Sequence, residues 1–548
     1  MSGTGCIAAL TPLAAGAAVS SEAVLFESRG VVLVLGDDAS AGDVAQALVT
    51  HHRTVVFAPG VDAREFDARV TAVGRRVTAV RGYLGAFQAE VTSAAGVSDI
   101  GAASPNPGRF FDMVLDLRRE PQWASGVAPL GYYAPGEDAA KRSAAVASMR
   151  GLVGRFTKPR YFGYRPELCA HGASGLHGCT RCLDVCATQA ISSAGALVRV
   201  NPHLCQGCAS CTLACPTGAL SFKYPSREAL GERLRQALSG VDPVNATLIV
   251  HSGALSSECN QAVDRHGAKC LQVNPIPAFG DELWVRAFGL GVKRLVLVND
   301  AAASKQSRMA VAARVAQMHA ILPALGIARA NLVWLTQGEL TDWLETRPGS
   351  GKPAVPGEQQ DVKADAAIPA AVSPRSAEDL SGGRSKRLVW LDALRQSAAG
   401  TGAGTAVELA GGAPFGEVRV YRRRCTLCFA CTQLCPTGAL LAQDGKTQRL
   451  LFRESACVQC GLCAQGCPEK AVSLHARFAA PAMLGMGTTV LHQDEQQACQ
   501  SCGTPFISRR LLASSLERLK AHPVMASGGR EALLTCPACR QRAMLSLS

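Results

Sequence analysis

The sequence lacks the features of several large protein classes. It has no run of 18 apolar residues, so no membrane-spanning helix is expected. The apolar stretch at 6–19 has no basic residues before it and contains Pro12, so it does not resemble a signal peptide. A P-loop, an HExxH motif, a Ser-His-Asp order and a flavin fingerprint are all missing. No independent catalytic site is therefore expected.

Two further classes are excluded by size and composition. Hydrophobic residues make up 48% of the chain, which is too many for a disordered protein. A secreted disulfide scaffold is normally short, whereas this chain has 548 residues, enough for three to four domains. What the sequence does have is 23 cysteines, most of them in tight clusters. In a reducing cytoplasm, where we expect the protein to reside, clustered thiols bind metal and do not pair with each other.

Most of the cysteines fall into four runs. Three runs have the form C-x2-C-x2-C-x3-C-P, which is the bacterial pattern for [4Fe–4S] clusters, and the remaining run is shorter. In this pattern three cysteines bind one cluster and the fourth binds the neighbouring cluster, so two runs exchange their fourth ligands. The runs are Cys179, Cys182 and Cys186; Cys205, Cys208, Cys211 and Cys215; Cys425, Cys428, Cys431 and Cys435; and Cys457, Cys460, Cys463 and Cys467.

The exchange rule predicts four clusters in two units. The second unit should bind one cluster through Cys425, Cys428, Cys431 and Cys467, and the other through Cys457, Cys460, Cys463 and Cys435. In the first unit, Cys205, Cys208 and Cys211 should bind a cluster with Cys186.

The last cluster of the first unit is one ligand short. Cys179, Cys182 and Cys215 need a partner, and Cys169 is the nearby candidate, with nine residues between it and Cys179. A loop of this length folds back at small entropic cost. The alternatives are a three-iron cluster or a histidine ligand, His171 or His177.

These runs resemble the two-cluster ferredoxin family over 169–224 and 418–475. The motif CPTGAL occurs at 215–220 and again at 435–440, with CATQAI at 186–191 and CPEKAV at 467–472. Zinc sites rarely have three cysteines at successive x2 spacing, so four zinc sites are the weaker interpretation.

A different cysteine pattern lies near the C-terminus. Cys499-x2-Cys502 and Cys536-x2-Cys539 predict a closed, tetrahedral structural zinc site of the zinc-ribbon kind. A rubredoxin-like iron site is the alternative. An amphipathic helix is expected between the pairs at 508–522, with Leu512, Leu516 and Leu519 on one side. Cys6, Cys259 and Cys270 remain as ordinary thiols.

The rest of the chain predicts α/β structure. Strands are expected at 30–36, 54–60, 110–118, 247–253 and 295–300, and helices at 43–52, 281–291, 308–326 and 387–396. The fold class is therefore multidomain α/β and α+β. The predicted parts are an α/β domain at 1–150, a first ferredoxin domain at 151–240, an α/β domain at 241–345, a Pro- and Gly-rich linker at 346–386, a helix with the second ferredoxin domain at 387–478, and a zinc-ribbon-like domain at 479–548.

Two longer resemblances suggest a setting for the protein. The stretch NPIPAFGDELWVRAFGLGVKRLVLVNDA (274–301) weakly resembles the small iron–sulfur subunit of methyl-viologen-reducing hydrogenase and heterodisulfide reductase, although that family's own cysteine cluster is mostly missing here. LCAHGASGLHGCTRCLDVC (168–186), APFGEVRVYRRRCTLCFACTQLCPTGAL (413–440) and CVQCGLCAQGCPEKAV (457–472) resemble bacterial 4Fe–4S proteins encoded beside molybdenum formate dehydrogenases. The long spacing after Cys169 matches that family.

The four clusters predict an electron carrier for a redox partner. The resemblance implies a setting more than a reaction, with formate dehydrogenase subunits as the expected partner. A maturation factor for that enzyme is the alternative function. A zinc-ribbon protein that binds nucleic acid is a second alternative, suggested by the net charge of +13. However, four clusters and one zinc ion held by thiolates would bring the net charge to roughly +3. The basic residues are then largely compensation for the cofactors, and no nucleic-acid partner is expected.

Overall fold

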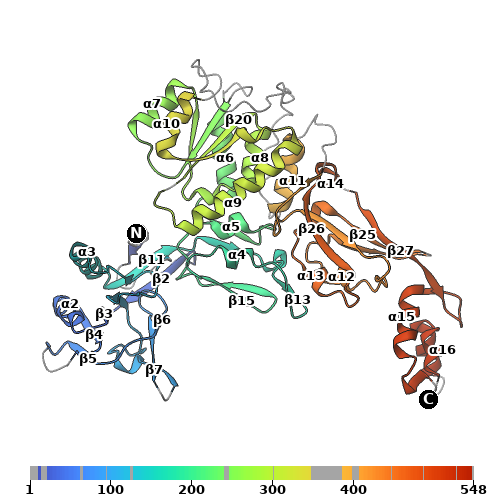
Figure 1. The fold of residues 1–548 in the computed structure, drawn as a ribbon, viewed down its shortest axis with the longest axis horizontal. Coiled ribbons are helices and arrows are strands. Elements are labelled where there is room, and N and C mark those ends of the chain that lie inside the picture. The colour runs from blue at the N-terminus through green and yellow to red at the C-terminus, as the bar shows by residue number, and fades with distance from the viewer. Residues whose placement is uncertain are drawn as a thin grey trace.

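The computed structural model describes residues 10–13, 21–61, 66–93, 96–123, 127–239, 246–299, 301–346, 386–397, 406–445, 447–485, 487–525 and 528–545. Cys6 and almost all of the predicted linker at 346–386 lie outside these residues. The chain has mixed α/β architecture, as predicted. Figure 1 shows an N-terminal part at one end, two ferredoxin-type units in the middle with a central α/β part above them, and a C-terminal tail at the opposite end. Within the described ranges, no helix combines the length and apolar character needed to cross a membrane.

The N-terminal part is built on a five-stranded parallel sheet with the strand order β10-β9-β3-β4-β5. Every residue of β3 (VVLVL) is buried, because a parallel sheet of this kind is covered on both faces. The three predicted strands and the helix between the first two are confirmed, with the helix three to four residues earlier than expected. The bounds are α2 (Ser40–Leu48), β3 (Val31–Leu35), β4 (Arg53–Phe57), β5 (Val70–Val73), β9 (Met113–Asp116) and β10 (Tyr132–Tyr133).

Smaller antiparallel elements, which the sequence did not predict, complete this part. One sheet is β6-β7-β8, and another, β1-β11-β2, leads into the first ferredoxin-type unit. The bounds are β1 (Thr11–Pro12), β2 (Ala23–Ser28), β6 (Ala79–Arg81), β7 (Gln88–Ser93), β8 (Gly96–Asp99), α3 (Ala139–Arg150) and β11 (Gly154–Pro159).

A buried histidine predicts that the N-terminal part is sensitive to acid. His52 follows α2 and is 3% exposed, and burial lowers the pKa of its imidazole below the ordinary value. The unfolded chain accepts a proton near pH 6.5, whereas the folded chain does not, so stability is complete above that pH and is lost as the pH falls below it. We expect the amide protection factors in 30–57, which correct for the intrinsic pH dependence of exchange, to fall between about pH 7 and pH 5 in the wild type and to fall less in His52→Phe.

The neighbouring His51 provides the control, because it is exposed. His51→Phe should keep the wild-type pH dependence. An equal fall of the protection factors in the wild type and in His52→Phe would contradict the assignment to His52.

The first ferredoxin-type unit consists of short hairpins around two small helices. Its antiparallel pairs are β12–β17, β13–β14 and β15–β16. Lys158 on β11 connects it to the N-terminal part, since its Nζ donates to the carbonyl oxygens of His203 and Cys205 at 2.8 Å each. The bounds are β12 (Phe162–Tyr164), η3 (Pro166–Leu168), β13 (Gly172–Ala173), β14 (Leu176–His177), α4 (Arg181–Asp184), β15 (Ile191–Ala194), β16 (Leu197–Val200), α5 (Ser210–Ala214) and β17 (Leu220–Phe222).

The central α/β part is a four-stranded parallel sheet, β19-β18-β20-β21. The predicted strands at 247–253 and 295–300 and the helices at 281–291 and 308–326 are confirmed as β18, β20, α8 and α9. Cys259 is buried in α7 and Cys270 is exposed on β19, so neither belongs to a cysteine group here. The bounds are α6 (Arg227–Leu238), β18 (Ala246–His251), α7 (Ser257–Arg265), β19 (Lys269–Gln272), α8 (Asp281–Gly289), β20 (Val292–Asn299), α9 (Lys305–Ile321), β21 (Leu332–Thr336) and α10 (Gln337–Thr346).

The helix predicted at 387–396 is confirmed as α11 (Lys386–Ser397), which packs against α8. Leu391 and Leu394 are buried, but Leu388 is 49% exposed, and Val389 and Trp390 are buried in its place. The buried face of α11 is therefore wider and rotated relative to the predicted leucine stripe.

The second ferredoxin-type unit and the tail share a sheet. The hairpin β24–β25 continues into the tail strands in the order β24-β25-β27-β28. The predicted helix at 508–522 is α15, in which Leu512 is buried and Leu519 is 38% exposed. The bounds are β22 (Val407–Glu408), β23 (Gly416–Val420), α12 (Ala430–Gln433), β24 (Leu440–Gln443), β25 (Thr447–Phe452), η8 (Glu454–Ala456), α13 (Leu462–Gln465), β26 (Val472–Phe478), α14 (Ala480–Leu484), β27 (Thr489–Ala498), β28 (Pro505–Ser508), α15 (Arg509–Leu519), α16 (Gly529–Leu533) and α17 (Pro537–Leu545).

Candidate iron–sulfur centres

The backbone of each C-x2-C-x2-C run turns twice through the left-handed region. One residue before the second cysteine and one after it have positive φ, and the third cysteine lies in the first turn of a short helix. These two turns let consecutive thiols face a common point. The residues are Gly207 and Ala209, Leu427 and Phe429, and Gln459 and Gly461, with φ between 53° and 90°.

The fourth cysteine of each run is also held by a repeated turn. The residue three positions after it has positive φ in all four runs: Gln189, Gly218, Gly438 and Lys470. In the second unit this turn aims backbone N–H groups at sulfur, from Ala439 to Cys435 Sγ at 3.2 Å and from Ala471 to Cys467 Sγ at 3.3 Å. Hydrogen bonds of this kind tune the potential of a cluster bound through the sulfur.

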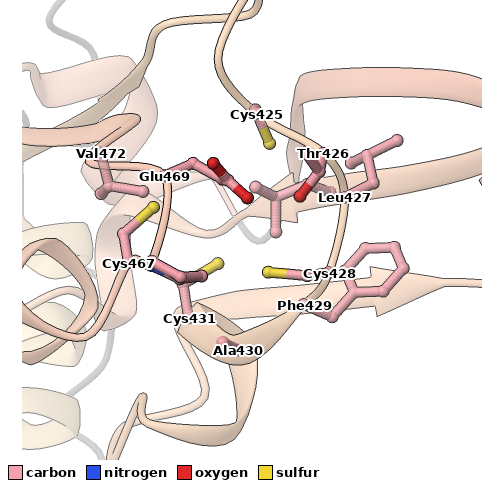
Figure 2. A pocket seen from close by; sticks show the side chains of 12 residues that line it. Cys425, Thr426, Leu427, Cys428, Phe429, Ala430, Cys431, Cys467, Glu469 and Val472 are labelled. Carbon is pink, nitrogen blue, oxygen red and sulfur yellow. The ribbon is translucent and has the colours of Figure 1, made fainter. Parts of the chain in front are cut away.

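The structure brings the predicted cysteines together in four groups. We call them site 1 (Cys186, Cys205, Cys208 and Cys211), site 2 (Cys169, Cys179, Cys182 and Cys215), site 3 (Cys435, Cys457, Cys460 and Cys463) and site 4 (Cys425, Cys428, Cys431 and Cys467). Figure 2 shows the four thiols of site 4 converging on one cavity, with Cys467 reaching it from the other run. Cys428 is the exposed cysteine of this site.

Site 2 surrounds a cavity of nearly the same size as that of site 4. The spaces measure about 350 and 340 Å³, including the open solvent at their mouths. Cys169 lines the site 2 cavity together with Cys179, Cys182 and Cys215. Burial raises the pKa of Cys182, and the thiols of Cys215, Cys179 and Cys169 raise it further. The cysteine distant in sequence is thus part of this group.

The local structure at Cys169 repeats that of an ordinary first cysteine. Cys169 follows the 3-10 turn η3 with φ −75° and ψ 129°, and Cys457 of site 3 follows the equivalent turn η8 with φ −72° and ψ 129°. The extra residues form the small hairpin β13–β14, with Ser174 and Gly175 at positive φ in its turn. The unusual spacing therefore reflects a hairpin inserted after the first cysteine.

The two histidines near site 2 are placed differently. His171 is 2% exposed, and its ring nitrogens hydrogen-bond the Cys179 carbonyl at 2.9 Å and the Ser193 hydroxyl at 2.8 Å. His177 is exposed on β14 and is not among the residues that line the site 2 cavity. Of the alternatives for the missing ligand, Cys169 has the better geometry.

Site 1 completes the first unit beside site 2, and site 3 completes the second unit beside site 4. In site 3, burial raises the pKa of Cys457 to about 11, and Cys460 and Cys435 add to the shift against the opposing effect of Arg387. In site 1, burial raises the pKa of Cys205 to about 11, and Cys208 and Cys186 contribute. Each set of four thiols is thus close enough to interact as one group.

The donor sets fit [4Fe–4S] clusters. Each site offers four cysteine sulfurs, the ligands of these clusters, in a largely apolar setting. Every cysteine within the described residues is free. Without a metal, thiols that are buried close to one another stay protonated, and metal binding would release their protons.

The tail holds a separate four-cysteine group, as predicted. The sulfurs of Cys499, Cys502, Cys536 and Cys539 all lie within 4.8 Å of one another. The backbone N–H of Cys536 donates to Cys499 Sγ at 3.2 Å, and the pKa of Cys499 is lowered to about 6, chiefly by this bond. Arg542 Nη2 donates to Cys539 Sγ at 3.1 Å. One metal ion with tetrahedral preference fits this set.

Sequence reasoning missed three basic residues that contact the cysteine loops. Arg181 Nη1 donates to Cys179 Sγ at 3.5 Å. Lys386 and Arg387 are buried at the start of α11 and donate to carbonyl oxygens next to site 1 and site 3. Nothing in the local sequence distinguishes these residues from ordinary surface cations, since the role of each depends on contacts more than 65 positions away in the chain.

Comparisons with known families agree with the two cysteine-rich regions. The family model described as "4Fe-4S dicluster domain" matches residues 424–472, and that described as "4Fe-4S binding domain" matches residues 197–220. No curated protein matches the chain. The predicted iron–sulfur, ferredoxin-type character is confirmed by these domains, and they support an electron-transfer role.

Proposed function

We propose that this chain is an electron-transfer protein that carries four [4Fe–4S] clusters and one structural zinc ion. The convergence of sixteen cysteines into four groups of four supports the cluster count. Such clusters supply one-electron redox chemistry when bound. The protein would contribute sulfur ligands, N–H donors to those sulfurs, and exclusion of water, which together set the potentials. We place the protein in the cytoplasm, because a reducing compartment keeps the thiols available.

The partner would dock at site 4. Cys428 is exposed there, and Arg422, Arg423 and Arg424 are exposed directly before Cys425. A cluster near the surface can exchange electrons with a partner, and a basic rim favours an acidic one. The sequence resemblance points to formate dehydrogenase subunits. An anaerobic pull-down from native cells, with Arg423→Glu as the variant, should recover them with the wild type and fewer with the variant.

Metal and sulfide analysis of the anaerobically purified chain tests the proposal. We expect about 16 iron, 16 sulfide and one zinc per chain, because each cube holds four of each and the tail site holds one ion. An iron content near four or eight would rule out four clusters. A chain that is purified under strictly anaerobic conditions from iron-replete cells and that contains zinc but no iron would rule out the iron–sulfur assignment.

A further inference from the structure

We propose that the four sites form one electron-transfer series in the order 1, 2, 3, 4, and that its central step crosses between the two ferredoxin-type units at Cys179 and Cys460. We further propose that Arg181 is the positioning residue of this step. The inference rests on the proposed function, because it requires clusters at all four sites. It adds the route that connects the two units.

The inserted hairpin of the first unit packs against the second unit. β14 contacts α13, and Figure 1 shows the β13 hairpin next to α13. A Cβ on Gly178 would lie 2.8 Å from Leu462 Cγ and 3.1 Å from the Cys460 carbonyl oxygen. The absence of a side chain at Gly178 therefore permits the close approach of the two cysteine loops.

The inner sites of the two units face each other at this contact. A Cβ on Gly178, the residue before Cys179, would meet the Cys460 carbonyl, and the Arg181 guanidinium reaches both Cys179 Sγ and the Val458 carbonyl of the Cys460 loop. Cys179 belongs to site 2 and Cys460 to site 3. These two sites are therefore neighbours, although their loops are 281 positions apart in the chain.

Arg181 joins the two loops directly. Its Nη1 donates to Cys179 Sγ at 3.5 Å in the first unit and to the Val458 carbonyl at 3.2 Å in the second. Its Nε and Nη2 donate to the Gly412 carbonyl at 3.1 and 2.9 Å. A single guanidinium thus fixes the spacing of the loops and places a positive charge beside a sulfur of site 2.

The first two residues of α11 also connect the two units. Lys386 Nζ donates to the Leu213 carbonyl of the first unit at 2.9 Å and pairs with Asp281 at 3.0 Å. The next residue, Arg387, donates to the Ser455 and Cys457 carbonyls of the second unit at 2.8 and 2.9 Å. Two consecutive residues therefore bind one unit each, which limits relative motion of the units.

Within each unit the remaining neighbours follow from the same kind of contact. The helix α5, which carries Cys211 of site 1, packs against α4, which carries Cys182 of site 2. In the second unit α13, which carries Cys463 of site 3, packs against α12, which carries Cys431 of site 4. Site 1 and site 4 are thus the ends of the series, and site 4 carries the exposed Cys428.

The central step would transfer one electron and no proton. Oxidation of site 2 by one electron is balanced by reduction of site 3 by one electron. A one-electron redox protein at each end would supply and remove the electrons. With a cluster bound at site 2, Arg181 would raise the affinity of that site for an electron, because its charge and the N–H group that it donates to Cys179 Sγ would stabilise added negative charge on the sulfurs.

Redox titration of the loaded full chain, followed by EPR, tests the role of Arg181. We expect Arg181→Gln to keep about 16 iron and to lower the equilibrium constant for reducing one site about tenfold, which is 59 mV for a one-electron couple. Arg181→Lys keeps the charge and should recover most of the shift. The exposed Arg199 on β16 provides the matched control, and Arg199→Gln should titrate like the wild type.

A wedge variant tests the junction itself. At full reduction, the spins of sites 2 and 3 should interact, and this interaction should weaken in Gly178→Leu, whose side chain would press on Leu462 and Cys460. Gly253→Leu is the control, because a Cβ at Gly253 meets no atom within 4 Å.

The outcomes separate the two proposals. A wild-type chain with fewer than four clusters contradicts the proposed function. A fully loaded chain in which Arg181→Gln matches Arg199→Gln, or in which Gly178→Leu leaves every spin interaction unchanged, overturns the inference about the junction and leaves the proposed function standing.

Discussion

Replacing Arg387 by methionine should destabilise the second ferredoxin-type unit by about 3–5 kcal/mol. The guanidinium is 7% exposed and donates to the Ser455, Pro414 and Cys457 carbonyls. It also lies over the Phe415 ring at 4.4 Å. Methionine preserves much of the volume but leaves these buried carbonyl groups without their donor, and each such group costs about 1–3 kcal/mol.

The buried positive charge of Arg387 is tolerated because it lies beside the cysteines of site 3. Burial lowers the pKa of Arg387 to about 10, and the Cys457 thiolate acts in the opposite direction. Clusters carry negative charge when held by four thiolates, so the guanidinium would gain its counter-charge from site 3. The effect of the substitution should therefore be larger in the loaded protein than in the metal-free chain.

The measurement is the denaturant midpoint of cluster loss, followed by cluster absorbance under anaerobic conditions. Arg395→Met on the same helix is the matched control. Arg395 is partly buried, pairs with Asp392 one turn away and donates to the Leu484 carbonyl at 3.3 Å, so its substitution should cost about 1–2 kcal/mol, less than that of the more deeply buried Arg387. Equal midpoints for the two variants would contradict the role assigned to Arg387.

Most of the site could be predicted because its chemistry is local in sequence. A C-x2-C-x2-C run fixes three thiols within seven residues, and the exchange rule then assigns the fourth ligand without knowledge of the fold. The strands and helices of the α/β parts were predictable for a similar reason, since β3 (VVLVL) is a continuous apolar segment of strand length and β18 (ATLIVH) has an apolar centre.

The contacts between the parts could not be predicted in this way. Arg181, Lys386 and Arg387 are unremarkable cations in the sequence, and their burial depends on backbone carbonyls brought close by the fold. The same reason explains Leu388, which shares the helical spacing of its neighbours but is exposed. The buried side of α11 is set by α8 and by the Phe415 and Phe478 rings of the second unit, which pack on Trp390. Helix propensity predicts that the segment is helical, whereas the elements that pack on the helix decide which of its faces is buried.

The hairpin after Cys169 is an intermediate case. From the sequence, the nine residues between Cys169 and Cys179, in place of the usual two, could be a loop with no role, or a sign that Cys169 is not a ligand. The structure shows that the backbone at Cys169 matches that at Cys457 and that the insertion packs on the second unit. The sequence does contain a sign of this hairpin, the Ser174-Gly175 pair at its turn. It does not show that the hairpin packs on α13, because α13 belongs to the other unit.

Cys169→Ala gives the sharpest test of this assignment. Site 2 would keep three sulfur ligands, so we expect the chain to lose about one to four of its 16 iron atoms and to show the EPR signal of a three-iron cluster in the oxidised state if the cluster survives. His171→Ala should keep all the iron, because both nitrogens of that ring are already bonded to the Cys179 carbonyl and the Ser193 hydroxyl. Cys259→Ala controls for removal of a buried thiol, since Cys259 lies in α7 at 3% exposure. Full iron in Cys169→Ala together with iron loss in His171→Ala or His177→Ala would transfer the fourth ligand to a histidine, and the match between the turns at Cys169 and Cys457 would then be a property of the fold alone.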